Sequence, residues 1–201
     1  MIFIRYESFR QYIRWYKATS LILLINILMF LETVIRGPGQ SFFFKNGVLI
    51  HAAPYTADWW RYVLSMFLHA DFIHLLFNCF AIFVFAPPLE RLLGIWRYAF
   101  LHLGSGIVGN VVSVLLHDPG VLSVGASGAI YGLYGAYLYL IVFRSGALDQ
   151  ASRKTVQLFL LLGILYTFLN LGRINVYAHL GGLAGGFIIF SGIVERMRQR
   201  R

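Results

Sequence analysis

Long apolar stretches alternate with short polar breaks along almost the whole chain. A helix needs about 20 apolar residues to cross a bilayer, and fewer suffice where neighbouring helices enclose it. We therefore predict six membrane-spanning helices, over residues 19–36, 71–86, 96–116, 123–143, 156–171 and 176–194. The breaks between them contain no internal repeat, no low-complexity segment and no second domain.

The composition agrees with this pattern. Of the 201 residues, 59% are hydrophobic and 12% are charged, and the mean hydropathy is +0.70. A soluble domain of this size needs far more charged surface. We therefore expect an all-α polytopic, multi-pass membrane protein. The single Cys79 can form no internal disulfide, and its apolar surroundings predict a small core residue.

Basic residues orient the predicted bundle, because cytoplasmic loops carry an excess of Lys and Arg. Thirteen of the 17 basic residues lie in the two chain ends and in the breaks at 87–97 and 144–155. The remaining ones are Arg36, Lys45, Arg61 and Arg173. Both termini are thus predicted to be cytoplasmic, with residues 1–18 and 196–201 as basic tails of a domain at 19–195.

This topology also explains the high isoelectric point, near 9.9. Basic segments beside a membrane attract anionic lipid headgroups, so membrane lipids are expected partners and no nucleic acid is required. The basic start of the chain resembles a signal peptide, but no small-residue cleavage site follows the first apolar stretch. We expect the helix over 19–36 to be retained.

Four polar residues interrupt the apolar stretches at a similar depth below the outer face. His74 and Asn78 fall in the first two turns of the second helix, on one face and about 6 Å apart along its axis. Ser127 and His179 fall near the first turns of the fourth and sixth helices. A lone transmembrane serine usually only packs, but a buried histidine or asparagine at depth is costly. Their convergence predicts a functional site.

Glycines give a reason to pair Ser127 with His179. Gly125, Gly128, Gly132 and Gly135 form a stripe in the fourth helix, and His179, Gly182 and Gly186 share a face of the sixth. Such stripes let two helix backbones approach closely. If the two faces meet, His179 can take the proton of the serine hydroxyl, which is otherwise a weak nucleophile. Tyr131, one turn after Ser127, is expected to pack on the imidazole.

Other hydrolytic sites fit the sequence less well. Most of the eight acidic residues map to breaks, tails or helix ends, which favours a Ser–His dyad without a cofactor over a triad and disfavours a pair of intramembrane aspartates. The chain lacks His-Glu-x-x-His, so no metal site is predicted. The run "GASGA" lacks the second glycine of a nucleophile elbow and follows no strand. His69 and His117, at helix ends, are expected to be solvated.

Taken together, these residues resemble the rhomboid family of intramembrane serine proteases over roughly residues 20–195. The matching segments are Trp60-Arg61, His74-x-x-x-Asn78, Gly125-Ala126-Ser127-Gly128 with Tyr131, and Ala178-His179-x-x-Gly182-x-x-x-Gly186. The resemblance implies a rhomboid-like six-helix bundle in which Ser127 is the nucleophile and His179 its base. Tyr131, Gly125 and Gly182 would support the pair. His74 and Asn78 would hold the oxyanion, and the backbone N–H of Ser127 would join them.

The same resemblance implies a bacterial cell-membrane endopeptidase whose active site opens to the outer face. Its substrates would be single-span membrane proteins, cut after a small residue at or near the outer end of their transmembrane helix. They would enter past the fifth helix, near "YTFLNLGRINVY", with the last loop as a lid. One segment departs from the family, because "FAPPLERLLG" after the second helix lacks the usual glycines.

Two other functions are weighed against proteolysis. A rhomboid-like protein without activity would bind membrane clients, but such relatives usually lack the serine or histidine of the dyad, and both are present here. A transporter or proton channel would also place polar residues at depth, and it would predict inverted repeats or broken helices near the midplane. The sequence has neither feature.

Overall fold

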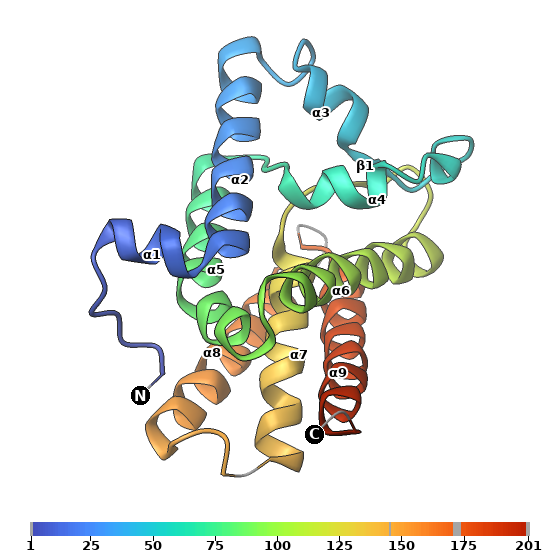
Figure 1. The fold of residues 1–201 in the computed structure, drawn as a ribbon. Helices are drawn as coiled ribbons and strands as arrows, with labels where there is room; N and C mark the ends of the chain where they lie inside the picture. The colour runs from blue at the N-terminus through green and yellow to red at the C-terminus, as the bar shows by residue number, and fades with distance from the viewer. Residues whose placement is uncertain (1, 145, 171–173, 200–201) are drawn as a thin grey trace.

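The structure is a computed structural model that describes residues 2–144, 146–170 and 174–199. Arg173, Arg200 and Arg201, which contribute to the charge count, and part of the predicted lid lie outside the described residues. The elements are α1 (Phe9–Trp15), α2 (Lys17–Arg36), α3 (Phe42–Gly47), β1 (Leu49–Ile50), η1 (Tyr55–Ala57), α4 (Arg61–Leu64), η2 (Ser65–Phe67), α5 (Phe72–Leu93), α6 (Ile95–Leu116), β2 (Leu122–Ser123), α7 (Ser127–Phe143), α8 (Gln150–Leu169) and α9 (Val176–Gln199). Figure 1 places α3, β1 and α4 at one end of the bundle and both chain ends toward the other.

A helix occupies each of the six segments that the sequence predicts to span the membrane: α2, α5, α6, α7, α8 and α9. Among the described residues, α2, α5, α6 and α9 are long and apolar enough to cross a membrane. The apolar helix α7 is shorter than a full span, and α8 begins in the polar segment before residue 156. Large apolar side chains on α2, α5 and α8 are exposed, among them Leu28, Phe77 and Leu161. Such an apolar surface suits contact with lipid.

Helix α7 forms the centre of the bundle, and every residue from Gly128 to Tyr137 is buried. Its main neighbours are α6 and α9. A Cβ atom on Gly182 would lie 2.0 Å from the carbonyl oxygen of Gly128, and one on Gly186 would lie 2.1 Å from that of Gly132. No side chain fits at such distances, so the expected meeting of the two glycine faces is confirmed.

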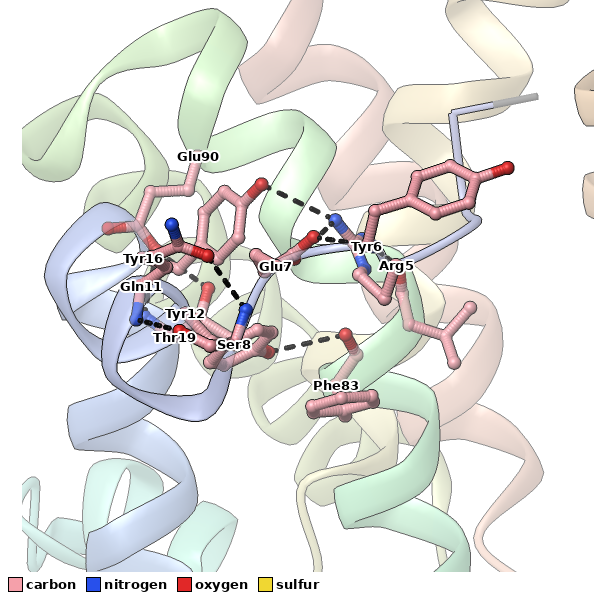
Figure 2. A network of polar contacts seen from close by, with 11 residues as sticks. Arg5, Tyr6, Glu7, Ser8, Gln11, Tyr12, Tyr16, Thr19, Phe83 and Glu90 are labelled. Carbon is pink, nitrogen blue, oxygen red and sulfur yellow. Dashed lines mark hydrogen bonds and ion pairs between the residues drawn. The ribbon is translucent and has the colours of Figure 1, made fainter.

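Helix α5 does not end at residue 86 as the sequence predicts, but continues through Pro87 and Pro88 to Leu93. Proline lacks a backbone N–H, so the carbonyl groups four residues earlier lose their helical donors. The N-terminal segment, residues 2–16, supplies both replacements. Tyr12 donates its hydroxyl to the carbonyl oxygen of Phe83 at 3.2 Å (Figure 2). Arg5 donates from Nη2 to the carbonyl oxygen of Val84 at 2.9 Å.

Glu90 is buried, which corrects its expected place in a cytoplasmic turn. Its carboxylate accepts hydrogen bonds from the backbone N–H groups of Ala18 and Thr19, both at 2.9 Å, and from the Thr19 hydroxyl at 2.6 Å. These N–H groups belong to the first turn of α2, where no helical acceptor exists. Glu90 therefore caps α2 from the neighbouring α5, an interaction that Figure 2 includes.

The long segment between α2 and α5 folds over the end of the bundle where α5 begins. Strands β1 and β2 pair antiparallel, with Leu49 opposite Ser123. Arg61 is buried, donates to Asp58 at 2.8 Å and bonds the carbonyl oxygen of Val48 at 2.9 Å. Trp59 is largely exposed, as expected for an interfacial aromatic side chain. Arg61 thus has a structural role in fixing this segment.

Candidate active site

Ser127 is the first residue of α7, directly after a sharp turn. The helix predicted over 123–143 begins only here, so Gly125 precedes it, with a φ of +125°. A Cβ atom at this glycine would lie 2.6 Å from Cε1 of His74 and 3.6 Å from Nδ2 of Asn78. Gly125 is therefore required both by its backbone conformation and by the two side chains of α5 beside it.

His179 lies in the first turn of α9 and faces Ser127. Its Nε2 atom is 2.8 Å from the Ser127 hydroxyl oxygen. The ring of Tyr131 stacks on the imidazole, with centroids 4.1 Å apart and planes 12° from parallel. The structure therefore brings together the three residues that the sequence analysis grouped, on α7 and α9.

Thr167 of α8 completes this arrangement and was missed by the sequence analysis. Its hydroxyl oxygen lies 2.8 Å from the carbonyl oxygen of Gly163, 2.9 Å from Nδ1 of His179 and 2.9 Å from the hydroxyl of Tyr131. A carbonyl can only accept, so the single Thr167 proton goes to Gly163, and the threonine oxygen accepts from the other two groups. His179 then carries its proton on Nδ1, and Nε2 presents a lone pair to Ser127.

Asn78 and His74 approach the turn before Ser127 from α5. Asn78 is buried, and its Nδ2 has no hydrogen-bond partner among the described residues. A buried amide without a partner is unfavourable in the resting protein. This amide nitrogen is therefore able to donate to an acceptor on a bound ligand. Asp71 accepts from the backbone N–H of His74 at 2.8 Å and so fixes the start of α5.

His69 differs from the expectation of a solvated histidine. Its side chain is only 1% exposed, and neither ring nitrogen has a hydrogen-bond partner within the part of the chain that the structure describes. Burial lowers the pKa of His69 to about 3. The neutral ring packs edge-on against His74 at 5.1 Å between centroids. His69 therefore supports the ring of His74, and only the tertiary packing reveals this.

Asn175 is another residue near the site that the sequence pattern does not predict. It accepts from the backbone N–H of Ala178 at 2.9 Å, in the first turn of α9. Its Nδ2 donates to the hydroxyls of Ser113 at 2.6 Å and Ser123 at 2.7 Å, which belong to α6 and β2. Asn175 thus fixes the start of α9, and with it His179, to two neighbouring elements.

Comparison with known proteins places these residues in context. A family model described as the Rhomboid domain matches residues 56–196, which include every site residue described above. The Bacillus subtilis protein named "Putative rhomboid protease YdcA" is 36% identical over 199 residues, covering 99% of this chain and all of that protein. The chain belongs to the rhomboid family.

Other rhomboid relatives are longer than this chain. RHOMBOID-like protein 7 of Arabidopsis thaliana is 32% identical over 161 residues, which are 80% of this chain and 51% of that protein. Rhomboid protease GluP of Bacillus subtilis is 30% identical over 175 residues, which are 84% of this chain and 33% of that protein. The family match, the proteases named among these relatives and the apolar helices together support an integral membrane protease.

Proposed function

We propose that this rhomboid protein is an intramembrane serine endopeptidase that acts through a Ser127–His179 dyad. The observation that carries the proposal is the 2.8 Å contact between Nε2 of His179 and the Ser127 hydroxyl, with Thr167 accepting from Nδ1. In this tautomer the imidazole can act as a general base toward the serine. The hydroxyl at the start of α7 is the group that attacks.

In the first half of the reaction, Ser127 Oγ bonds to the carbonyl carbon of the scissile peptide while its proton passes to Nε2 of His179. The carbonyl oxygen becomes an anion. The amide of Asn78, a ring N–H of His74 and the backbone N–H of Ser127 donate to it, and each such donor is worth about 3 kcal/mol. When the intermediate collapses, the C–N bond breaks and His179 protonates the leaving amine.

In the second half, water hydrolyses the acyl-enzyme. His179 takes a proton from water, the hydroxide attacks the ester carbonyl, and the imidazolium returns the proton to Ser127 Oγ. Tyr131 stacks on the ring throughout and restricts its rotation. Thr167 accepts the Nδ1 proton in each state, so the same tautomer is restored for the next cycle.

The substrates we propose are single-span membrane proteins, cleaved after a small residue at or near the outer end of their helix. The excess of basic residues at the chain ends and in alternate breaks supports cytoplasmic termini. Ser127 and His179 begin their helices, so they would then lie near the outer face. Entry past α8 fits its largely exposed surface, since only Ser152, Val156 and Thr167 of that helix are buried.

The test is cleavage of a quenched fluorescent transmembrane peptide by the detergent-purified full chain. Wild type is compared with Ser127→Ala, His179→Ala and a matched control, Ser191→Ala, which changes a half-buried serine farther along α9. We expect both dyad variants to lose cleavage while keeping the wild-type helical spectrum, and the control to keep cleavage. Full activity in a folded Ser127→Ala protein would refute the dyad and leave the client-binding alternative.

A further inference from the structure

A cavity of about 1110 Å³ lies at the end of the bundle farthest from Ser127. Its walls are the N-terminal segment, here residues 2–16, and the C-terminal ends of α5, α7 and α9. Helix α7 starts at Ser127 and lines the cavity with Tyr137 and Leu140, and Arg144 follows directly after the helix. At 1.5 Å per residue, these residues lie about 15–25 Å from Ser127 along the axis. This cavity is therefore separate from the candidate active site.

Four arginines line the cavity, against a single acidic residue, Glu7. They are Arg5, Arg91, Arg144 and Arg198. Outside the lining, Glu195 pairs with both Arg144 at 2.8 Å and Arg198 at 3.3 Å. Two carboxylates thus face four guanidinium groups, and the site keeps an excess of positive charge.

Some N–H donors of these arginines have no hydrogen-bond partner among the described residues. Arg91 makes no ion pair or side-chain hydrogen bond within residues 2–144, 146–170 and 174–199. Arg5 is held by Glu7 at 3.5 Å and by the hydroxyl of Tyr16 at 3.5 Å (Figure 2). Its Nε is nevertheless buried without a partner among the described residues. Guanidinium groups with free N–H donors suit the oxygens of a phosphate.

Most of the remaining lining residues are apolar. Leu89, Leu92, Leu148, Val194 and Met197 line the cavity, with Trp15 beside them. A free inorganic anion would make no favourable contact with such apolar walls. A glycerophospholipid has both parts, an anionic phosphate and acyl chains. The cavity also lies where the apolar helices end, which is the depth of lipid headgroups.

We propose that this cavity binds one anionic glycerophospholipid of the inner leaflet. The phosphodiester lies among Arg91, Arg144 and Arg198, and the upper acyl chains lie on the leucine-lined walls. The lipid then contacts the N-terminal segment and the ends of α5, α7 and α9 at once. It stabilises the folded protein by mass action, because the unfolded chain has no such site.

The test uses the detergent-purified full chain and three soluble probes: dihexanoyl phosphatidylglycerol, dihexanoyl phosphatidylcholine and inorganic phosphate. Thermal unfolding is followed as each probe is titrated. We expect phosphatidylglycerol alone to raise the melting temperature in a saturable manner. The double variant Arg91→Gln with Arg198→Gln should weaken the apparent affinity about tenfold or more. The matched control Arg10→Gln with Arg14→Gln removes two basic residues outside the cavity lining and should bind like wild type.

Two results would overturn the site. One is an equal loss of affinity for phosphatidylglycerol in the control and cavity variants. This would mean that the lipid is attracted to basic surface in general. The other is an equal response to inorganic phosphate or phosphatidylcholine, which would mean that an anion or any lipid suffices. If the double variant is too unstable to titrate, Arg91→Gln alone decides, since Arg91 has no partner to lose among the described residues. The peptide-cleavage assay on Ser127 does not depend on either result.

Discussion

The side chains around Ser127 have different predicted roles, and each role can be tested by a substitution. Thr167 is the clearest, because its hydroxyl has one proton and three polar neighbours. We infer that it acts through His179, as a positioning residue. Asn78 is the opposite case, a buried donor with no partner within the part of the chain that the structure describes.

Replacing Thr167 with valine removes the acceptor for the Nδ1 proton. The other tautomer, with its proton on Nε2, then becomes accessible and cannot act as a base toward Ser127. We expect kcat to fall about ten- to a hundredfold, part of the 10²–10⁴ that acid–base catalysis provides, with little change in KM. Thr167→Ser keeps the hydroxyl and should restore kcat. Equal loss in the serine and valine variants would point to packing alone.

Replacing Asn78 with alanine removes a proposed oxyanion donor. The expected fall in kcat is about 10²–10³, as for other donors of this kind. Because the amide nitrogen has no partner to lose among the residues that the structure describes, the melting temperature in detergent should stay the same or rise. A variant with unchanged kcat would remove Asn78 from the oxyanion site, and a large drop in melting temperature would assign it a structural role instead.

Helices in this protein depend on partners that are distant in the sequence. Two prolines sit inside α5, and the N-terminal segment provides donors for the carbonyls that they leave free. Helices α7 and α9 approach until their backbones touch. In both cases a helix depends on residues that are distant in the sequence. The prolines of α5 need donors from the N-terminal segment, and the glycines of α9 need glycines opposite them on α7.

The link between Tyr12 and Pro87 can be measured with a double-mutant cycle. Tyr12→Phe leaves the Phe83 carbonyl without its donor, which should lower the free energy of unfolding by about 1–3 kcal/mol in mixed micelles. In a Pro87→Ala background, residue 87 regains a backbone N–H for that carbonyl. The same Tyr12→Phe change should then have a smaller effect. Identical effects in both backgrounds would contradict the proposed link.

Close packing of α9 on α7 predicts different responses from two glycines of one helix. Gly182→Ala places a methyl group 2.0 Å from the Gly128 carbonyl oxygen, whereas a Cβ on Gly192 meets nothing within 4 Å. We expect Gly182→Ala to displace His179 from Ser127, abolish peptide cleavage and lower the melting temperature. Gly192→Ala should be neutral or stabilise the helix by up to about 1 kcal/mol. Equal behaviour of the two variants would contradict this packing.

Across the whole molecule, the sequence predicts features that follow from periodicity. The apolar stretches predicted the positions of all six long helices. The spacing of the glycines predicted that the helix faces that carry Ser127 and His179 would meet. Helix ends were less predictable. Pro87 and Pro88 usually stop a helix, but here the carbonyls of Phe83 and Val84, which lose their helical donors, accept hydrogen bonds from Tyr12 and Arg5. Thr167 and His69 were missed for a similar reason: each acquires its role only when distant elements pack beside it.

The whole fold also divides the chain into two chemically different ends. One end gathers Ser127, His179, His74 and Asn78, and the other gathers the arginines around the large cavity. The glycine-rich contact between α7 and α9 runs between them. This division lets the peptidase chemistry and the lipid site be tested separately.

The most direct test of the dyad is labelling with a fluorophosphonate, followed by mass spectrometry of the peptide that contains Ser127. An activated serine attacks phosphorus and keeps the phosphonyl group, whereas an ordinary hydroxyl does not react. We predict an adduct on Ser127 in the wild-type protein, much slower labelling in His179→Ala and none in Ser127→Ala. Absence of an adduct in the folded wild type, or equal labelling rates in wild type and His179→Ala, would contradict a Ser127–His179 dyad.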